Sequence, residues 1–522
     1  MQESEGYKGI YAMHKYWGKK PFNVVSNFIE NYSKEGDIVL DSFCGSGVTA
    51  IEAIRCKRKA IAFDINPIAI KITNVSLTAI EPSRLDEEFR KMKKLLKSQI
   101  NKMYEIECPN CGRICTVSHV IWNQKEPIEV WSKCTCKISK NITTATAKDY
   151  EQSNSPILEP KWFPETKMIP NSRINVQRDQ NVSDLFTNRA IVGLSLIKEY
   201  IDNISDREIK ETMEVVFTGC LSQASKLVFV IRNRGGKDRE DNKADVGSWV
   251  AGYWVPKEHF EINVWNCFEN RYSRVKKGKN EVFTLFNNEV KFANCYSELT
   301  SANVYSKICS ATQLDLPDDS VDYVFIDPPH TNRVLYGEMS LMWNAWLGSD
   351  SNISWENEIV VSESKERKKS FENYNKLIRD SIKEIGRVLK PNCALSIAFN
   401  SLEDSSWFGL LNACTESGFK IADIKPLEYS ATSVMQDNRE NALKTDFVIT
   451  SFNMKNEYKG NIEIVSDTKV ISEEIAAILE ERPMETYEVI NAVMVKTIKS
   501  GFFYAPSKIV DELNSIRVNF HF

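Results

Sequence analysis

The sequence predicts an α/β protein with a doubly wound sheet, a large insertion and a small helical unit near its C-terminal end. Two observations lead to this prediction. A strand at 37–40 runs into a glycine turn and a helix at 50–55, and a second strand at 60–63 then ends at Asp64. This order is typical of the nucleotide-binding half of such a sheet. A further apolar run, 321–326, is followed by two prolines, which end a buried strand abruptly.

The composition is that of a globular protein. Of the 522 residues, 42% are apolar and 26% are charged, and this length predicts two to four structural units. No run of eighteen apolar residues is present and residues 1–11 are too polar for a secretory signal, so we expect a cytoplasmic protein without a membrane span. The net charge of −4 means that any nucleic-acid surface must be a local feature.

Changes of pattern along the chain divide it into segments. A helix is expected to begin at Pro21, ahead of the first strand of the sheet. Ser83 followed by Asp86 predicts a capped start for a charged helix that leaves the sheet, and strand patterns resume near Val304. We therefore expect a first catalytic part at 1–83, an insertion at 84–288, a second catalytic part at 289–454 and a helical accessory tail at 455–522.

The loop at 41–49 suits a ligand that approaches the backbone closely. Gly45 and Gly47 remove side chains from the turn, and the helix start behind them favours a carboxylate. Asp64 can accept both hydroxyls of an unphosphorylated ribose. No Lys-Ser or Lys-Thr pair follows the glycines, which argues against a P-loop phosphate cradle. These features suit S-adenosylmethionine, and a glycine-rich packing turn is the alternative.

The tetrapeptide Asp327-Pro328-Pro329-His330 suits a planar group that carries an NH2, such as a nucleobase. An exocyclic amine is a weak nucleophile because its lone pair is delocalised into the ring. Asp327 and the Pro328 carbonyl could each accept one N–H and turn the lone pair towards a methyl donor, which is catalysis by alignment. The planar ring of His330 could stack on such a base. A purely structural proline turn is the alternative.

Four cysteines predict a structural zinc site in the insertion. Cys108 and Cys111 are separated by two residues, and Cys134 and Cys136 by one. Two close thiolate pairs suit tetrahedral zinc, and a set of four ligands leaves no open position for catalysis. The alternatives are a reduced, metal-free cluster, or substitution of a ligand by Cys115 or His119.

Target recognition is expected in the part of the insertion that is rich in basic residues. Residues 226–280 hold twelve Lys or Arg against seven Asp or Glu. Basic side chains interleaved with Trp249, Tyr253 and Trp254 suit phosphate contacts and base stacking, although a solvated loop over buried aromatics fits the same pattern. The basic candidates are Arg232, Arg234, Lys237, Arg239, Arg271, Arg274, Lys276, Lys277 and Lys279.

The glycine loop and Asp327-Pro328-Pro329-His330 together resemble the amino-group DNA methyltransferases, in the motif order of their alpha arrangement. Segments 14–21, 182–186 and 334–347 further resemble a bacterial group of site-specific, adenine-type enzymes with a Cys-rich insert. The resemblance implies a class I methyltransferase fold with a Rossmann-like sheet, and double-stranded DNA as partner. It also implies a restriction-modification setting, in which restriction or phage-defence proteins would be further partners.

The resemblance also implies roles for individual residues. His330 stands where such enzymes usually carry Tyr, Phe or Trp. Ala311 stands where many of them have an acidic residue that contacts the donor's adenine, a contact that would then rest on Gln313 or Asp315. The implied catalytic residues are Asp327, Pro328, Pro329 and His330, and the implied donor-binding residues are Tyr16, Lys20, Pro21, Asp41, Phe43, Gly45, Gly47, Thr49, Asp64 and Ile65.

We therefore expect an S-adenosylmethionine-dependent DNA methyltransferase that acts on adenine N6 of a flipped base in a specific site. Cytosine N4 is the alternative within the same chemistry because the two amines are similarly placed. A catalytically decayed nucleic-acid-binding subunit is the alternative from another class, motivated by His330 and Ala311. Binding of labelled donor to the folded protein separates these hypotheses.

Overall fold

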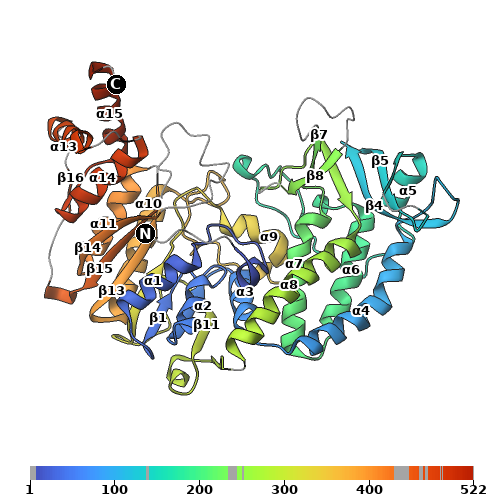
Figure 1. Ribbon diagram of the computed structural model, residues 1–522, viewed down its shortest axis with the longest axis horizontal. Helices are drawn as coiled ribbons and strands as arrows, with labels where there is room; N and C mark the ends of the chain where they lie inside the picture. The colour runs from blue at the N-terminus through green and yellow to red at the C-terminus, as the bar shows by residue number, and fades with distance from the viewer. Residues whose placement is uncertain are drawn as a thin grey trace.

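The computed structural model describes residues 7–136, 140–232, 244–249, 252–287, 289–401, 403–427, 446–457, 462–464, 468–481, 484 and 486–520. Within these residues the chain forms an eight-stranded sheet, a seven-stranded sheet and a two-stranded one. Figure 1 shows the two large sheets at opposite ends of the molecule, with long helices between them.

The eight-stranded sheet is mixed and matches the predicted α/β class. Its order is β10-β11-β2-β1-β12-β13-β15-β14, and β15 runs antiparallel to both of its neighbours while the other pairs are parallel. The strands are β1 (Ile38–Asp41), β2 (Lys59–Asp64), β10 (Phe292–Ala293), β11 (Val304–Ile308), β12 (Val321–Ile326), β13 (Leu389–Phe399), β14 (Phe419–Leu427) and β15 (Asp446–Asn453).

Helices cover both faces of this sheet because its strands are apolar on both sides. In β12, Tyr323 and Phe325 join one hydrophobic core, whereas Val324 and Ile326 join the other. The first core includes α1 (Phe22–Tyr32), α2 (Val48–Arg55), α3 (Pro67–Leu77) and α9 (Tyr336–Leu347), and the second includes α10 (Phe371–Val388) and α11 (Asp404–Glu416). Short 3-10 helices are η1 (Gly9–Ala12), η2 (Ser172–Ile174), η3 (Val182–Leu185), η4 (Tyr296–Thr300), η5 (Asp350–Asn352) and η6 (Lys455–Glu457).

The chain between the two halves of this sheet forms the second sheet, of order β6-β5-β4-β9-β7-β8 with β3 paired to β4. Its strands are β3 (Glu105–Glu107), β4 (Ile114–Asn123), β5 (Glu126–Lys133), β6 (Asn141–Thr144), β7 (Val228–Arg232), β8 (Ala244–Trp249) and β9 (Glu258–Ile262). Its helices are α4 (Pro82–Lys102), α5 (Ala147–Asn154), α6 (Asn188–Asp202), α7 (Arg207–Ala224) and α8 (Val264–Phe286).

One local prediction in this region was wrong. Helix α4 begins at Pro82, so Ser83 lies in its first turn and does not cap it; a proline at the first helical position explains this start. The long helix α8 was not predicted: Val264, Phe268 and Val275 recur there at helical spacing and are fully buried.

Three helices form in the C-terminal segment, where the sequence predicts a small helical unit. They are α13 (Thr468–Glu481), α14 (Thr486–Lys499) and α15 (Pro506–Phe520), with β16 (Glu463–Ile464) paired to β17 (Phe502–Phe503). Ile475, Val493 and Ile509 are fully buried in the core that also holds α10 and α11. None of the helices in the described part of the chain is long and apolar enough to cross a membrane.

Candidate active site

One pocket lies at the carboxyl edge of the eight-stranded sheet, where β1, β2 and β12 end beside one another. Asp41 pairs in register with Ala62 of β2, and Leu40 with Val324 of β12, so the residues that follow these strands converge. The empty volume of the pocket is about 990 Å³, its open mouth included. Of the predicted site residues, Tyr16, Lys20, Asp41, Phe43, Gly45, Thr49, Asp64, Ile65, Asp327 and Pro329 line it, whereas Pro21, Gly47, Pro328 and His330 do not.

The glycine loop forms one wall of this pocket, and its two glycines differ in what they do. Gly45 has φ +50° and lines the pocket, where its N–H donates to Asp64 Oδ2 at 2.8 Å. Gly47 has φ +81° and caps α2, and a Cβ there would lie 2.7 Å from Thr73 Oγ1. A Cβ on Gly45 would lie 3.0 Å from Tyr16 Cε1, so this glycine lets the Tyr16 ring approach the loop, whereas Gly47 allows the loop to pack against α3.

The two carboxylates beside the loop are held in position by backbone donors. Asp41 accepts the Phe43 N–H at 3.0 Å, and Asp64 accepts the Asn66 N–H at 2.9 Å. Burial raises the pKa of Asp41 to about 7 and that of Asp64 to about 6, and the hydrogen bonds act in the opposite direction. Ser42, also in the lining, is 2% exposed, and its hydroxyl has no hydrogen-bond partner among the described residues.

Asp327 lies across the pocket in a network of charged side chains. Its Oδ2 is 2.7 Å from Lys20 Nζ, and the same ammonium lies 3.1 Å from Asp446 Oδ2. Its Oδ1 accepts no hydrogen bond from the described residues, although His330 Nε2 lies 3.3 Å away. One carboxylate oxygen of Asp327 is thus anchored by Lys20, and the other is buried beside His330.

The His330 ring lies beneath the loop rather than in the pocket. It packs edge-on against Phe399 at 5.3 Å between ring centroids, and Nε2 lies 3.4 Å from the Ala398 carbonyl oxygen. The aromatic rings that line the pocket instead include Tyr16, Trp17 and Tyr336, together with Phe43 and Phe325. Tyr16 and Tyr336 stack on each other at 5.7 Å between centroids.

The far wall of the pocket includes residues that the sequence analysis did not single out. Glu358 accepts the Gly337 N–H at 2.7 Å and an Arg367 N–H at 2.6 Å, and Asn357 lines the pocket beside it. Their positions depend on contacts between distant segments, and no local pattern marks them. Ala311 is in the lining, but Gln313 and Asp315 are not, and Asp315 instead accepts hydrogen bonds from Lys307 and Tyr305.

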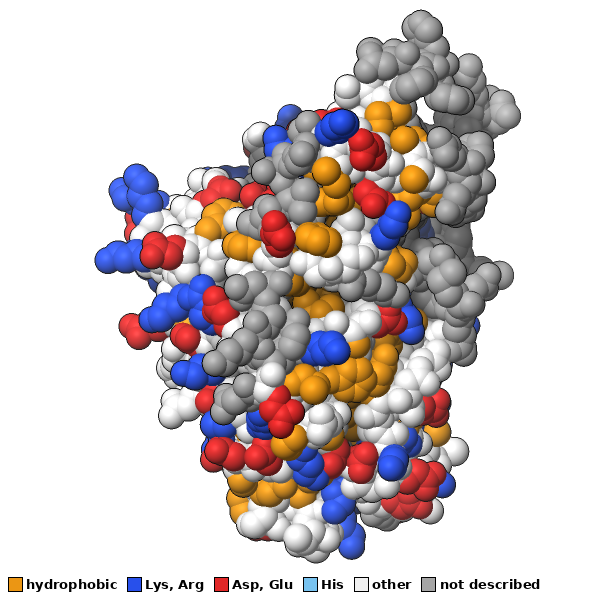
Figure 2. Space-filling model, turned by 90° about the vertical axis from the view of Figure 1, so that its left-hand side faces the viewer, with side chains coloured by type: hydrophobic (Ala, Val, Ile, Leu, Met, Phe, Trp, Pro, Cys, Tyr) orange, Lys and Arg blue, Asp and Glu red, His pale blue; other side chains and the backbone are white. Residues whose placement is uncertain are grey.

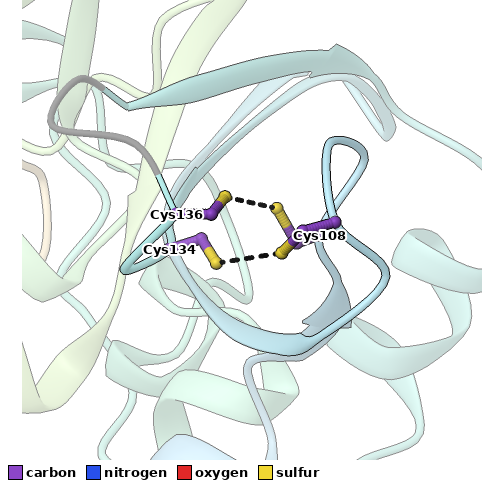
Figure 3. Close-up of side chains that lie close together, drawn as sticks. Cys108, Cys134 and Cys136 are labelled. Atoms are coloured by element: carbon purple, nitrogen blue, oxygen red, sulfur yellow. Dashed lines mark hydrogen bonds between the residues drawn. The ribbon is translucent and has the colours of Figure 1, made fainter.

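The four predicted zinc ligands come together at one end of the second sheet (Figure 3). All four Sγ atoms lie within 4.8 Å of one another, with Cys108 and Cys136 at 3.6 Å and Cys111 and Cys134 at 3.7 Å. Tetrahedral zinc with bonds of about 2.3 Å requires sulfur atoms about 3.8 Å apart, so this arrangement fits the ion.

Neighbouring donors favour the thiolate form of two of these residues, Cys108 and Cys111. A hydrogen bond from Arg113 Nε to Cys111 Sγ, at 3.5 Å, lowers the pKa of that thiol to about 6. Asn141 Nδ2 donates to Cys108 Sγ at 3.5 Å. Cys115 is buried and His119 stacks near Trp131, and neither belongs to the group of close sulfur atoms.

Several of the predicted DNA-contacting residues have structural partners instead. Lys279 is 1% exposed and donates to the Val75 carbonyl at 2.8 Å, Lys276 pairs with Asp86, and Arg232 pairs with Glu258. A buried lysine requires such acceptors, and the buried Lys279 is therefore not placed to contact DNA. The predicted residues Arg234, Lys237 and Arg239 lie outside the described residues, whereas Arg274, Lys277 and Trp254 are exposed.

No single-sign charge dominates the face of the molecule that Figure 2 presents. Lys and Arg side chains are interspersed there with Asp and Glu, around hydrophobic atoms that gather in its middle. Tyr253, another predicted stacking residue, is buried, and its hydroxyl lies 2.8 Å from the Glu338 carbonyl oxygen. Tyr253 therefore ties the second sheet to α9 beside the pocket.

Comparison with known proteins gives matches to methyltransferases. Residues 2–75 match the family model described as DNA methylase. Over 105 residues the chain is 30% identical to the type II methyltransferase M.MjaII of Methanocaldococcus jannaschii, a match that covers 20% of this chain and 18% of that protein. The chain thus spans less than a fifth of the length of this curated relative.

Solved structures give weaker matches. A SAM-dependent methyltransferase of Methanosarcina mazei is 10% identical with a TM-score of 0.25, over 82% of this chain and 98% of that one. A proposed DNA modification methylase of Thermus thermophilus is 12% identical with a TM-score of 0.17, over 32% and 61%. TM-scores this low carry no argument about the fold or the function. Over residues 2–75 and over a 105-residue segment, the chain is therefore similar to DNA methyltransferases.

Proposed function

We propose that this chain is an S-adenosylmethionine-dependent methyltransferase that methylates the exocyclic amine of a base in double-stranded DNA, with adenine N6 as the first candidate and cytosine N4 as the second. The observation that carries the proposal is that one pocket is lined by the glycine loop, by Asp64 and by Asp327 with Pro329. The sheet order, with its one antiparallel strand β15, supports a class I methyltransferase fold.

The residues of the pocket fit the donor. Asp64 would accept the ribose hydroxyls, and the N–H groups around Gly45, with the unpartnered hydroxyl of Ser42, would receive the amino-acid part. Tyr16 and Tyr336 offer aromatic faces that suit a cationic group. When bound, the donor would supply a methyl group on a positively charged sulfur.

The catalytic loop fits an amine that needs alignment. The carboxylate of Asp327, which lines the pocket, would accept one N–H, and the Pro328 carbonyl would accept the other, which orients the lone pair. Asp327 keeps its orientation because Lys20 holds Oδ2 at 2.7 Å. A base can reach this pocket only after it has left the duplex, so we propose base flipping.

Stacking of the flipped base is assigned to Tyr336 rather than to His330. Tyr336 lines the pocket, and its hydroxyl lies 2.7 Å from the position that a Cβ on Gly18 would occupy. His330 lies outside the lining and contacts Phe399. The unusual residue in the tetrapeptide therefore does not argue against catalysis, because the pocket has another aromatic face beside Asp327.

We further propose that residues 84–288 form an insertion that recognises the target, with a structural zinc ion on Cys108, Cys111, Cys134 and Cys136. The close sulfur atoms and the hydrogen bonds to Cys108 and Cys111 support zinc. The exposed Arg274, Lys277 and Trp254 remain candidates for DNA contacts. The ion would hold β3, β4 and β5 together and would take no part in methyl transfer.

Two linked measurements test the function. Equilibrium binding of labelled S-adenosylmethionine to the wild-type protein comes first, and failure of the folded protein to bind it would favour the decayed, nucleic-acid-binding alternative. Incorporation of the labelled methyl group into unmethylated genomic DNA and into RNA comes second, followed by hydrolysis to nucleosides. N6-methyladenine in DNA supports the first candidate, N4-methylcytosine the second, and label in RNA alone contradicts the DNA assignment.

A further inference from the structure

We propose that Asp446 is a positioning residue for the reaction: it holds Lys20, and through Lys20 it fixes the orientation of the Asp327 carboxylate. This inference rests on the proposed function, in which Asp327 accepts a hydrogen bond from the base. Asp446 is the first residue of β15 and lies 119 residues beyond Asp327 in the sequence. Neither the family-model match nor the 105-residue match to M.MjaII is long enough to include both residues.

The two oxygens of Asp327 have different surroundings. Oδ2 is bound by the Lys20 ammonium at 2.7 Å, whereas Oδ1 accepts no hydrogen bond within the part of the chain that the structure describes. A carboxylate that must present one oxygen to an amine needs its other oxygen fixed, because rotation about the Cβ–Cγ bond would turn the acceptor away. The ion pair with Lys20 therefore fixes the rotation of the Asp327 carboxylate about its Cβ–Cγ bond.

Lys20 itself is held from the opposite side by Asp446. Its ammonium lies 3.1 Å from Asp446 Oδ2 and 3.4 Å from the Gly18 carbonyl oxygen, and the residue is only 6% exposed. A long side chain with a buried charge keeps one conformation only where fixed acceptors surround the charge. Within the described residues, Asp446 and Asp327 are two carboxylates that pair with it.

Burial and a hydrogen bond hold the Asp446 carboxylate itself in place. It is 6% exposed, and its Oδ1 accepts a hydrogen bond from Asn400 Nδ2 at 3.0 Å. Arg333 lies 4.0 Å from the same oxygen. Asn400 follows β13 and Asp446 begins β15, and these strands are paired, with Phe399 opposite Phe447. The network Asn400–Asp446–Lys20–Asp327 thus links the ends of three adjacent strands, β12, β13 and β15. These paired strands hold the catalytic loop in one position.

A positioning role makes a different prediction from a merely structural one. Asp446→Asn keeps the shape of the side chain and one acceptor oxygen, but removes the charge that holds Lys20 from the side opposite Asp327. We expect the rate of methyl transfer in a single turnover to fall about 10- to 100-fold, because small misplacements of a catalytic group have effects of that size. The dissociation constant for the donor should stay within about twofold, since Asp446 is not in the pocket lining.

The experiment measures single-turnover transfer of tritiated methyl groups to unmethylated genomic DNA, donor binding and thermal unfolding. The variants are Asp446→Asn, Asp446→Glu, which keeps a carboxylate, and the control Asp423→Asn on neighbouring β14, where Asp423 pairs with Lys425 at 3.3 Å. We expect Asp446→Glu to regain at least part of the rate and Asp423→Asn to match the wild type. If Asp446→Asn does not fold, Asn400→Ala replaces it, with the same expectation of slower transfer and unchanged donor binding.

The outcomes separate this inference from the function on which it rests. A wild-type protein that binds no donor or methylates no DNA would overturn the proposed function and this inference with it. An Asp446→Asn variant that methylates DNA as fast as an active wild type would overturn the inference alone. Equal rate losses in Asp446→Asn and Asp446→Glu, or a parallel loss of donor binding, would also overturn it, because a carboxylate for Lys20 would then not be the determining feature.

Discussion

Asp64 gives the proposed donor site a pH dependence whose direction follows from the structure. Burial raises the pKa of Asp64 from its ordinary 3.8 to about 6. Only the carboxylate form can accept hydrogen bonds from both ribose hydroxyls, so a proton must leave Asp64 before the donor binds. Donor affinity should therefore be high above pH 6 and fall as the pH is lowered through that value.

The size of the effect follows from the same pKa of about 6. The ionised fraction of Asp64 in the free protein is about ten elevenths at pH 7 and about one eleventh at pH 5, so the dissociation constant should rise about tenfold between them. Asp64→Asn should weaken binding at pH 8 by about 10- to 100-fold, the cost of a lost charge-assisted hydrogen bond. In the wild type, the Gly45 and Asn66 N–H groups donate to the two Asp64 oxygens at 2.8 and 2.9 Å. In the variant, the side-chain NH2 must face one of these two N–H groups.

Titration calorimetry with S-adenosylmethionine from pH 8 to pH 5 measures both effects. Asp41, whose pKa burial raises to about 7, titrates in the same range, but it is present in both proteins. The ratio of the wild-type and Asp64→Asn dissociation constants therefore isolates Asp64, and the advantage of the wild type should shrink about tenfold from pH 7 to pH 5. A ratio that is constant with pH, or a variant that binds as tightly as the wild type at pH 8, would refute the assignment of Asp64.

Further predictions concern the catalytic loop, the cysteine cluster and the glycine turn. Asp327→Ala should abolish methyl transfer and leave DNA binding in a mobility-shift assay within about twofold, and full activity in this variant would refute its role. Cys111→Ser should lower the bound zinc in metal analysis from one ion per chain to less than one, and should lower the unfolding temperature. The control Cys295→Ser, at an exposed cysteine, should do neither. Equal zinc in both variants would argue against the site. Gly47→Ala should lower the free energy of unfolding in denaturant more than Gly36→Ala does. Both glycines have a positive φ (+81° and +88°), but only a Cβ on Gly47 would meet a neighbour, Thr73 Oγ1 at 2.7 Å. Backbone strain accounts for about 1–2 kcal/mol in each case, so equal losses would contradict the packing role of Gly47.

The strands that position the pocket could be predicted from the sequence because their signals are local. The apolar runs before Asp41, Asp64 and Asp327 each end at a residue that lines the pocket, and their order along the chain implies a shared edge. The spacing of Cys108, Cys111, Cys134 and Cys136 likewise predicted a cluster that the fold brings within 4.8 Å. The segment boundaries at 83, 288 and 454 and the roles of individual residues stay predictions.

What could not be predicted depends on contacts between distant segments. Lys20 was expected to bind the donor, but its ammonium pairs with Asp327 and Asp446, a partner more than 400 residues away. His330 was expected to stack in the pocket, yet the turn directs it towards Phe399. Helix α8 was missed because charged residues on its outer face obscured the helical spacing of its buried ones.

The central claim, that this chain methylates an exocyclic amine in DNA through Asp327, is tested most directly by methylation-sensitive sequencing of DNA from cells that express the wild-type protein or Asp327→Ala. We expect N6-methyladenine at one recurrent sequence with the wild type, and no methylation of that sequence with the variant. Both proteins must accumulate to equal levels. DNA that carries no methylated base above the Asp327→Ala background would contradict the account.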